Sequence, residues 1–404
     1  MDPKGLIHSV DEECCVELLS ELVRFESCAG TPGEAALSRL LAERMERIGL
    51  DASLQPVDGE RCNAVGVLRG TGGGRSLLLN GHVDTNPLTR GWTVGPWSGL
   101  VRDGFVYGLG VSNMKAGDAA CFCAVKTLVE RGVKLRGDVV LTFVVGELQG
   151  GIGTLRAIKD LPHADCFVNC EPTDMQAVTR HAGNVHFTIE LEGATRHLSK
   201  RGEAVDALAA ACALAARIAG AAFGEESDRE RRRLNCAHVG VLRAALTSDF
   251  DESRPAQVAD FARMEGSARY APGRSEESAL ADLRRLLDEL EAERPGLRAH
   301  LRVRPLLNGV RPMLPFEVDR GEFIVGALNR AYEAVRGEAQ PTGAIAPACL
   351  YWTDAAHLLH HAGLPGVVCG PGGKHNTMPD ERVAVADYLD MIRVYMLTIL
   401  DVCG

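Results

Sequence analysis

The stretch that decides the fold reads Leu77-Leu78-Leu79-Asn80-Gly81-His82-Val83-Asp84-Thr85. Its short apolar run predicts a buried strand, and the strand ends in a His-x-Asp pair. A histidine at the carboxyl end of a strand can present its imidazole to a cleft. The carboxylate of Asp84 can reach back and fix the tautomer of His82, as acids beside zinc ligands do. Alone this pair is a weak signal, because a histidine near an acid is common on protein surfaces.

Helical and strand patterns alternate around this stretch. Apolar residues recur at helical spacing over 12–25 and 34–48, and β-rich runs follow at 63–68, 138–145 and 165–169. This alternation predicts an α/β layered domain with a buried sheet.

The pattern of helical and strand signals changes at about Gly183, and the α/β pattern returns after Pro305. The intervening stretch predicts a smaller α+β domain of three strands and two helices, at 184–191, 204–222, 237–242, 262–270 and 275–293. We therefore expect one catalytic α/β domain in two pieces, 1–182 and 305–404, with a lid or dimerisation domain inserted at 183–304.

Composition excludes several classes of protein. The chain has 404 residues, which favours two compact units, and 44 basic against 54 acidic residues with no basic run argue against nucleic-acid binding. No apolar stretch is long enough to span a membrane, so we expect a cytoplasmic protein without membrane contacts. The 13 cysteines are irregularly spaced, which is not typical of a disulfide framework.

Further motifs follow the His-x-Asp pair in a set order. They are Val106-Tyr107-Gly108-Leu109-Gly110-Val111-Ser112-Asn113-Met114-Lys115, Gly146-Glu147-Leu148-Gln149-Gly150-Gly151, Glu171-Pro172-Thr173, Cys369-Gly370-Pro371-Gly372 and Pro379-Asp380-Glu381. Together they resemble the zinc-dependent amidohydrolases that include aminoacylase, acetylornithine deacetylase, succinyl-diaminopimelate desuccinylase and carboxypeptidase G. The resemblance covers nearly the whole chain and implies the family's zinc-peptidase α/β fold.

The resemblance also implies roles for individual residues. His82 and Glu171 take the place of ligands to a first metal, and Asp84 the place of the acid that orients the site. Asn113 stands where the family has an aspartate that bridges two metals. Glu147 stands at the position of the general base.

The ligands of a second metal are replaced. Leu148 and Thr377 occupy the positions of a glutamate and a histidine, and neither leucine nor a lone threonine is a good zinc ligand. We therefore expect no two-zinc centre, and either no metal or one weakly bound zinc on His82, Glu171 and Asn113. His375, two residues before Thr377, could supply a ligand if its loop shifts. Asn113, His375 and Thr377 are alternatively expected to contact the substrate.

The inserted domain carries part of the resemblance. His197 matches a histidine that reaches the substrate carbonyl across a dimer, and Arg269 matches an arginine that binds the substrate carboxylate. A homodimer through the inserted domain is therefore expected. Ala256 replaces a substrate-contacting asparagine of the family.

The expected pKa of Glu147 bears on the choice between the possible functions. A carboxylate beside Leu148 and away from cations should have a raised pKa, which suits acid–base catalysis without zinc. The retention of Glu147, His82, Asp84 and His197 favours an enzyme. We prefer metal-independent or weakly metal-dependent acid–base chemistry, such as acyl transfer, cyclisation or elimination, on a small amide-containing or amino-acid-derived metabolite. The alternatives are a single-zinc amidohydrolase of N-acyl amino acids and a non-catalytic binding protein.

Overall fold

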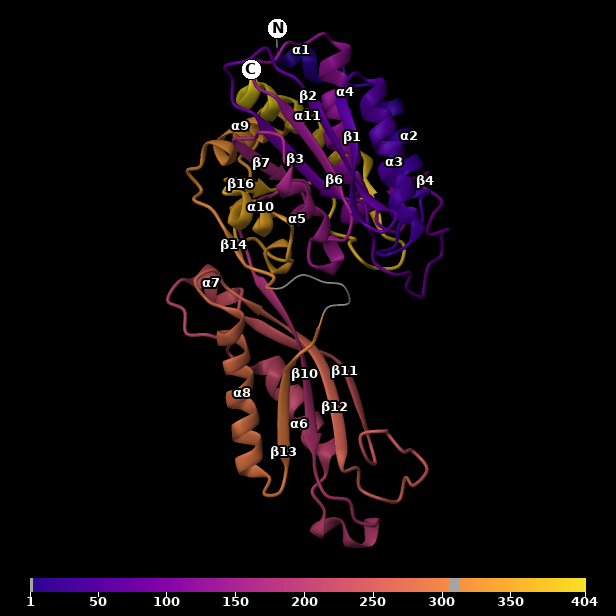
Figure 1. Cartoon of the computed structure of the whole chain (residues 1–404), viewed down its shortest axis with the longest axis vertical. Coiled ribbons are helices and arrows are strands. Elements are labelled where there is room, and N and C mark those ends of the chain that lie inside the picture. Colours follow the sequence, from indigo (N-terminus) through magenta and orange to yellow (C-terminus); the bar gives the residue numbers. More distant parts are fainter. Residues whose placement is uncertain (1–2, 306–311) are drawn as a thin grey trace. The chain divides into compact units, whose positions relative to one another are not determined.

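The computed structural model describes residues 3–305 and 312–404 and divides the chain into two compact units (Figure 1). The first unit comprises 1–180 and 316–404, and the second comprises 181–315. The expected boundaries, 182/183 and 304/305, lie close to these. The second boundary falls later than expected because the Met313 carbonyl accepts hydrogen bonds from the Asn184 N–H at 3.0 Å and the Tyr270 hydroxyl at 2.9 Å.

An eight-stranded mixed sheet forms the centre of the first unit. In spatial order its strands are β1 (Asp51–Asp58), β2 (Arg61–Leu68), β6 (Val139–Val144), β3 (Leu77–His82), β7 (Cys166–Asn169), β16 (Gly366–Val368), β8 (Ala177–Val178) and β15 (Thr342–Gly343). Strand β3 lies between β6 and β7 and is parallel to both. Every residue of these three strands is buried, as expected for parallel strands covered on both faces.

Helices surround this sheet, and the predicted α/β class is confirmed. They are α1 (Pro3–Ile7), α2 (Glu12–Val23), α3 (Pro32–Arg47), α4 (Ala116–Glu130), α5 (Ile152–Lys159), α9 (Phe323–Arg336), α10 (Ala355–Ala362) and α11 (Val385–Cys403). Helix α11 packs against α4 and α9, whereas α10 packs against α5. A small sheet of β4 (Leu100–Arg102), β5 (Phe105–Tyr107) and β17 (Arg382–Ala384) joins the two pieces of the unit.

The second unit is a four-stranded antiparallel sheet with helices packed on it (Figure 1). The sheet order is β11 (Cys236–Ala245), β12 (Phe261–Tyr270), β10 (Gly183–Glu192) and β13 (Arg298–Val303), and the helices are α6 (Ala207–Gly220), α7 (Arg229–Arg233) and α8 (Glu276–Glu293). Strand β13 is missing from the sequence-based expectation of three strands. It is an edge strand whose alternate residues Arg298, His300 and Arg302 are polar, so its apolar signal is short.

The two units are joined by a ribbon of β9 (Arg180–His181) and β14 (Phe316–Glu317). None of the helices in the described residues is both long enough and apolar enough to cross a membrane.

The core of the first unit should be sensitive to the loss of side-chain volume in its central strands. Leu141 in β6 is fully buried, so Leu141→Ala is expected to lower the free energy of unfolding by about 2–5 kcal/mol. Leu208, which is 45% exposed, is the matched control, and Leu208→Ala should change the unfolding free energy by less than about 0.5 kcal/mol. Urea denaturation measures both. Equal losses in the two variants would contradict the assigned core.

Candidate active site

Three neighbouring strands deliver the polar residues of the site to one edge of the sheet. Strand β3 ends at His82, β6 leads into Glu147, and β7 leads into Glu171. Because the strands are parallel, their carboxyl ends meet at the same edge, which is where α/β sheets bind ligands. His82 is 1% exposed and both glutamates are 5% exposed, so the charges here are largely withdrawn from water.

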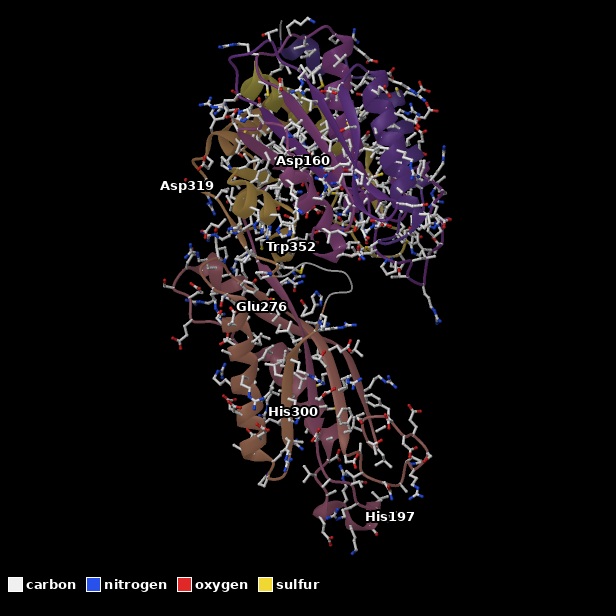
Figure 2. The ribbon with its side chains drawn as sticks, in the orientation of Figure 1. Asp160, His197, Glu276, His300, Asp319 and Trp352 are labelled. Atoms are coloured by element: carbon white, nitrogen blue, oxygen red, sulfur yellow. The ribbon has the colours of Figure 1, made fainter. Side chains whose placement is uncertain are left out.

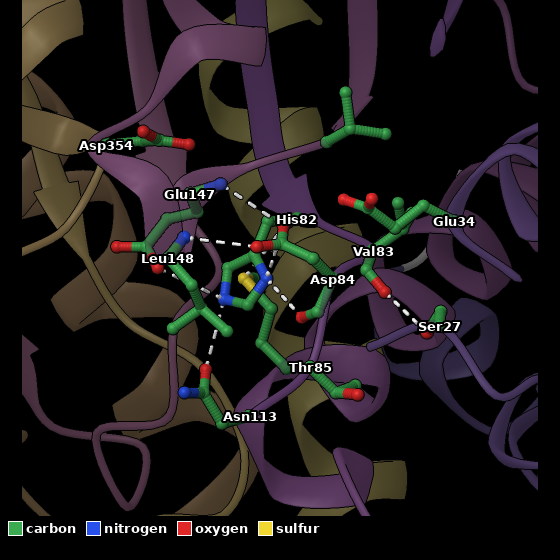
Figure 3. Close-up of polar contacts among 12 residues, drawn as sticks. Ser27, Glu34, His82, Val83, Asp84, Thr85, Asn113, Glu147, Leu148 and Asp354 are labelled. Atoms are coloured by element: carbon green, nitrogen blue, oxygen red, sulfur yellow. Dashed lines mark hydrogen bonds and ion pairs between the residues drawn. The ribbon is translucent and has the colours of Figure 1, made fainter. Parts of the chain in front are cut away.

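The imidazole of His82 is the centre of a cluster that we call the His82 cluster: His82, Asn113, Glu147 and Glu171. Figure 3 shows the side chains of Asn113 and Glu147 beside this imidazole. Its Nε2 lies 3.1 Å from Asn113 Oδ1, 3.3 Å from Glu171 Oε1 and 3.9 Å from Glu147 Oε2. Burial alone would lower the pKa of His82, but the carboxylates of Glu171 and Asp84 raise it well above its usual value.

Asp84 orients His82 differently from the sequence-based expectation. His82 Nδ1 lies 2.8 Å from the backbone carbonyl oxygen of Asp84 and 3.5 Å from its carboxylate. A carbonyl oxygen only accepts hydrogen bonds, so Nδ1 carries the proton and Nε2 faces the cluster. The carboxylate also accepts hydrogen bonds from the backbone N–H groups of Glu147 and Leu148, each at 3.1 Å. Asp84 therefore fixes both His82 and the turn that carries Glu147.

The carboxylate of Asp84 stays ionised although it is fully buried. Burial would raise its pKa, but the hydrogen bond and charge of His82 and the two backbone N–H groups hold the pKa below its ordinary value. Glu147 behaves in the opposite way. Burial, followed by the charge of Glu171, raises the pKa of Glu147 well above its usual value, as the sequence predicts.

Glu381 fixes the position of Asn113. Its carboxylate accepts hydrogen bonds from the backbone N–H groups of Gly110, Ser112 and Asn113, at 3.2, 2.8 and 3.0 Å. These bonds shape the segment η1 (Val111–Lys115), from which the Asn113 side chain reaches His82. Burial raises the pKa of Glu381 to about 7, even though the three N–H groups favour its charged form.

Among the described residues, the His82 cluster could hold a metal ion. His82, Glu147 and Glu171 each offer a ligand atom, and these atoms lie within 4.8 Å of one another. An imidazole and two carboxylates are suitable zinc ligands. This set differs from the expected set of His82, Glu171 and Asn113, because it includes the residue predicted to act as general base. Asn113 adds a neutral oxygen beside it.

Other predicted residues of the first unit lie outside this group. His375 is half-buried, and its ring packs edge-on against Phe105 with ring centroids 6.2 Å apart. Thr377 is exposed and has a left-handed backbone with φ of 52°. Their contact with the substrate stays a prediction.

His197 and Arg269 belong to the second unit. His197 is exposed at the start of the turn η3 (Leu198–Glu203), where its Nδ1 accepts from the Ser199 N–H at 3.3 Å (Figure 2). Arg269 lies on β12, opposite Asn184 of β10. Their roles at the substrate carbonyl and carboxylate stay predictions.

Two buried acids near the cluster were not predicted as site residues. Asp354 accepts a hydrogen bond from the Thr154 hydroxyl at 2.8 Å, and burial raises its pKa to about 7. Asp118 lies beneath Gly81, where an added Cβ would come within 2.0 Å of its Oδ1. Burial raises the pKa of Asp118 well above its usual value. The sequence pattern that could have identified Asp118 is a single acid in the otherwise apolar segment 116–125.

The pKa of Asp354 predicts how stability depends on pH. Its value in the folded protein, about 7, exceeds its ordinary value of 3.8, so folding favours the protonated form. The contribution of Asp354 is full below about pH 4 and is lost as the pH rises through about 7. In metal-free protein, Asp354→Asn should weaken the fall in unfolding free energy between pH 5 and pH 8 by on the order of 1–3 kcal/mol.

Urea denaturation at a series of pH values measures this change. Asp58→Asn, at an exposed aspartate, is the matched control and should keep the wild-type slope. An unchanged slope in Asp354→Asn would show that this carboxyl titrates as an ordinary one.

Comparison with known proteins shows which family the chain belongs to. The model of peptidase family M20/M25/M40 matches residues 78–401. N-formyl-4-amino-5-aminomethyl-2-methylpyrimidine deformylase of Bacillus subtilis (strain 168) is 26% identical over 375 residues, which cover 85% of this chain and 83% of the relative.

Solved structures agree in fold. Human carnosine dipeptidase 1 superposes with a TM-score of 0.77 at 14% sequence identity. The superposition covers all of this chain and 99% of the dipeptidase chain. Aminopeptidase PepT from Bacillus cereus ATCC 10987 gives a TM-score of 0.75 at 18% identity, with 98% and 99% of the two chains covered. The resemblance inferred from the motifs is confirmed. The chain is therefore an enzyme of the peptidase family M20/M25/M40.

Proposed function

We propose that this enzyme hydrolyses an amide bond in a small N-formyl or N-acyl compound at the His82 cluster, with one metal ion. The observation that carries the proposal is the convergence of His82, Glu147 and Glu171 at the carboxyl ends of three adjacent strands. The deformylase relative supports amide hydrolysis, because it aligns with most of this chain. It favours the amidohydrolase alternative over the metal-independent chemistry preferred from the sequence.

The metal would be held by His82 and Glu171, with the Asn113 carbonyl oxygen completing the set, which leaves the Glu147 carboxylate for proton transfer. A bound zinc ion supplies a Lewis acid for the amide carbonyl and lowers the pKa of water. The Asp84 carbonyl holds a proton on His82 Nδ1, so a metal ion that displaced the proton on Nε2 would bind there. A second metal does not fit, because Leu148 has no donor atom and Thr377 offers only a hydroxyl.

Glu147 would move the protons of the reaction. Its carboxylate takes a proton from the attacking water and returns it to the leaving nitrogen, so that the products are a carboxylic acid and an amine. Glu147 must be ionised to act as a base. Its raised pKa opposes this, but a nearby cation favours the charged form and lowers the pKa. A cation in the cluster would therefore activate Glu147 as well as the substrate.

A second candidate function is acid–base chemistry without metal. It is favoured by the leucine at 148, and by the pKa of Glu147, which burial raises well above its usual value. In that case protonated Glu147 would act first as an acid, and acyl transfer, cyclisation or elimination would follow without added water.

A metal-removal experiment separates these functions. Protein purified without chelator is expected to hold up to one equivalent of zinc and to release amine from members of a panel of N-formyl and N-acyl amines. Removal of the metal should abolish this activity, and zinc should restore it. Glu147→Gln should lower kcat by about 10²–10⁴-fold, because the amide cannot carry the proton. Glu60→Gln, at an exposed glutamate, is the control.

The outcomes are distinct. Turnover that resists the chelator but is lost in Glu147→Gln supports the metal-free candidate. Full activity in Glu147→Gln would contradict both functions.

We further propose that the enzyme forms a homodimer through the second unit. Strand β11 is an edge strand of its sheet, and it exposes 46% of Val241 and 37% of Leu242. An unpaired apolar edge can be covered by the same edge of a second copy. Val241→Glu is expected to shift the mass measured by light scattering from dimer to monomer. Val101→Glu, at a residue 48% exposed in the first unit, should stay dimeric. A wild-type monomer would overturn the proposal.

A further inference from the structure

Glu147 is carried by a turn that glycine makes possible. Gly146, Gly150 and Gly151 have φ angles of 72°, 82° and 77°, in the left-handed region that glycine adopts without strain. The turn is closed by its own backbone bonds, because the Gly150 and Gly151 N–H groups donate to the Glu147 carbonyl at 2.9 and 3.2 Å. Side chains from outside the turn contact it at both ends.

The leading end of the turn is fixed by Asp84. Its two carboxylate oxygens accept from the backbone N–H groups of Glu147 and Leu148 (Figure 3). This contact ties the turn to the strand that carries His82. Neither of these two hydrogen bonds involves Gly150 or Gly151.

The trailing end is fixed by His357, in α10. His357 Nε2 lies 2.9 Å from the Gly150 carbonyl oxygen, which can only accept, so Nε2 is the protonated nitrogen and donates. The side chain is 1% exposed, and burial lowers the pKa of His357 to about 4. His357 is therefore a neutral donor at physiological pH, and its contact with the turn does not depend on titration.

The surroundings hold His357 in this position. Its ring packs edge-on against Trp352, with centroids 5.1 Å apart. A Cβ at Gly151 would come within 2.5 Å of His357 Cδ2 and 2.4 Å of Asp354 Oδ1, so α10 lies directly against the turn. Asp354 anchors the start of α10 to α5 through the Thr154 hydroxyl.

We propose that His357 is a positioning residue, which sets the orientation of Glu147 through its hydrogen bond to the Gly150 carbonyl. Asp84 and His357 then hold the two ends of one turn, and the carboxylate between them has a fixed direction toward His82. The inference rests on the proposed function only for its effect on catalysis. Its effect on the turn is independent of the reaction.

A matched pair of amide variants tests this role. The amide nitrogen of glutamine lies as many bonds from Cα as His Nε2 does, whereas that of asparagine lies one bond closer. His357→Gln can therefore donate to Gly150, and His357→Asn cannot reach it. Both variants are neutral and polar. His360→Asn, at an exposed position of the same helix, is the control.

Three readouts should change together in His357→Asn. Hydrogen exchange of the backbone amides in 147–151 should become about 5–10-fold faster, as expected for the loss of one buried hydrogen bond. The affinity for zinc, measured by competition with a chelating dye, should fall by about 10–100-fold, and kcat should fall by a similar factor. His357→Gln and His360→Asn should match the wild type in all three.

A milder variant keeps the proposal testable if His357→Asn misfolds. Thr154→Val removes the hydroxyl that anchors Asp354 but leaves His357 unchanged, and it should speed exchange in the same segment by about threefold. Unchanged exchange in both His357→Asn and Thr154→Val, or equal behaviour of His357→Asn and His357→Gln, would overturn the proposal. If the wild type hydrolyses no amide but exchange still separates the two amide variants, the positioning role stands and the proposed hydrolysis fails.

Discussion

The buried imidazole of His82 is the group on which the site depends. Four carboxylates, Asp84, Glu147, Glu171 and Asp354, are withdrawn from water around it. Buried acids are tolerated only when they are paired, protonated or bound to a cation. The structure uses the first two solutions. Asp84 is paired with His82 and two N–H groups, whereas burial raises the pKa values of Glu147 and Asp354. The excess of acids over imidazole makes the cluster a favourable place for one cation.

The substitutions relative to the family have unequal consequences for such a cation. Leu148 and Thr377 remove the ligands private to a second ion, and Asn113 replaces a bridging charge by a neutral oxygen that still contacts His82 at 3.1 Å. The remaining acids Glu171 and Glu147 lie 3.3 and 3.9 Å from His82 Nε2. A single ion is therefore balanced by nearby charge, whereas a second ion would be bound by neutral or apolar groups. The proposed chemistry therefore uses one metal ion and Glu147 as the proton carrier.

Much of this was predictable from sequence, because strand ends and motifs are local. The run from Leu77 to Thr85 predicts β3 and the presentation of His82, and the glycines around Glu147 predict its turn. Other features depend on contacts between distant segments. The hydrogen bond between His82 Nδ1 and the Asp84 carbonyl follows from the backbone after β3, and His357 contacts Gly150 across 207 residues. Strand β13 was not predicted, because an edge strand needs few apolar residues.

The central claim is that the His82 cluster holds one metal ion and no more. Anomalous diffraction from crystals soaked in zinc, recorded on both sides of the zinc absorption edge, tests it most directly. We expect a single anomalous peak bounded by His82 Nε2 and the carboxylates of Glu171 and Glu147. Two peaks separated by about 3.5–4 Å, as in two-metal sites, would contradict the claim, and so would the absence of any peak at this position.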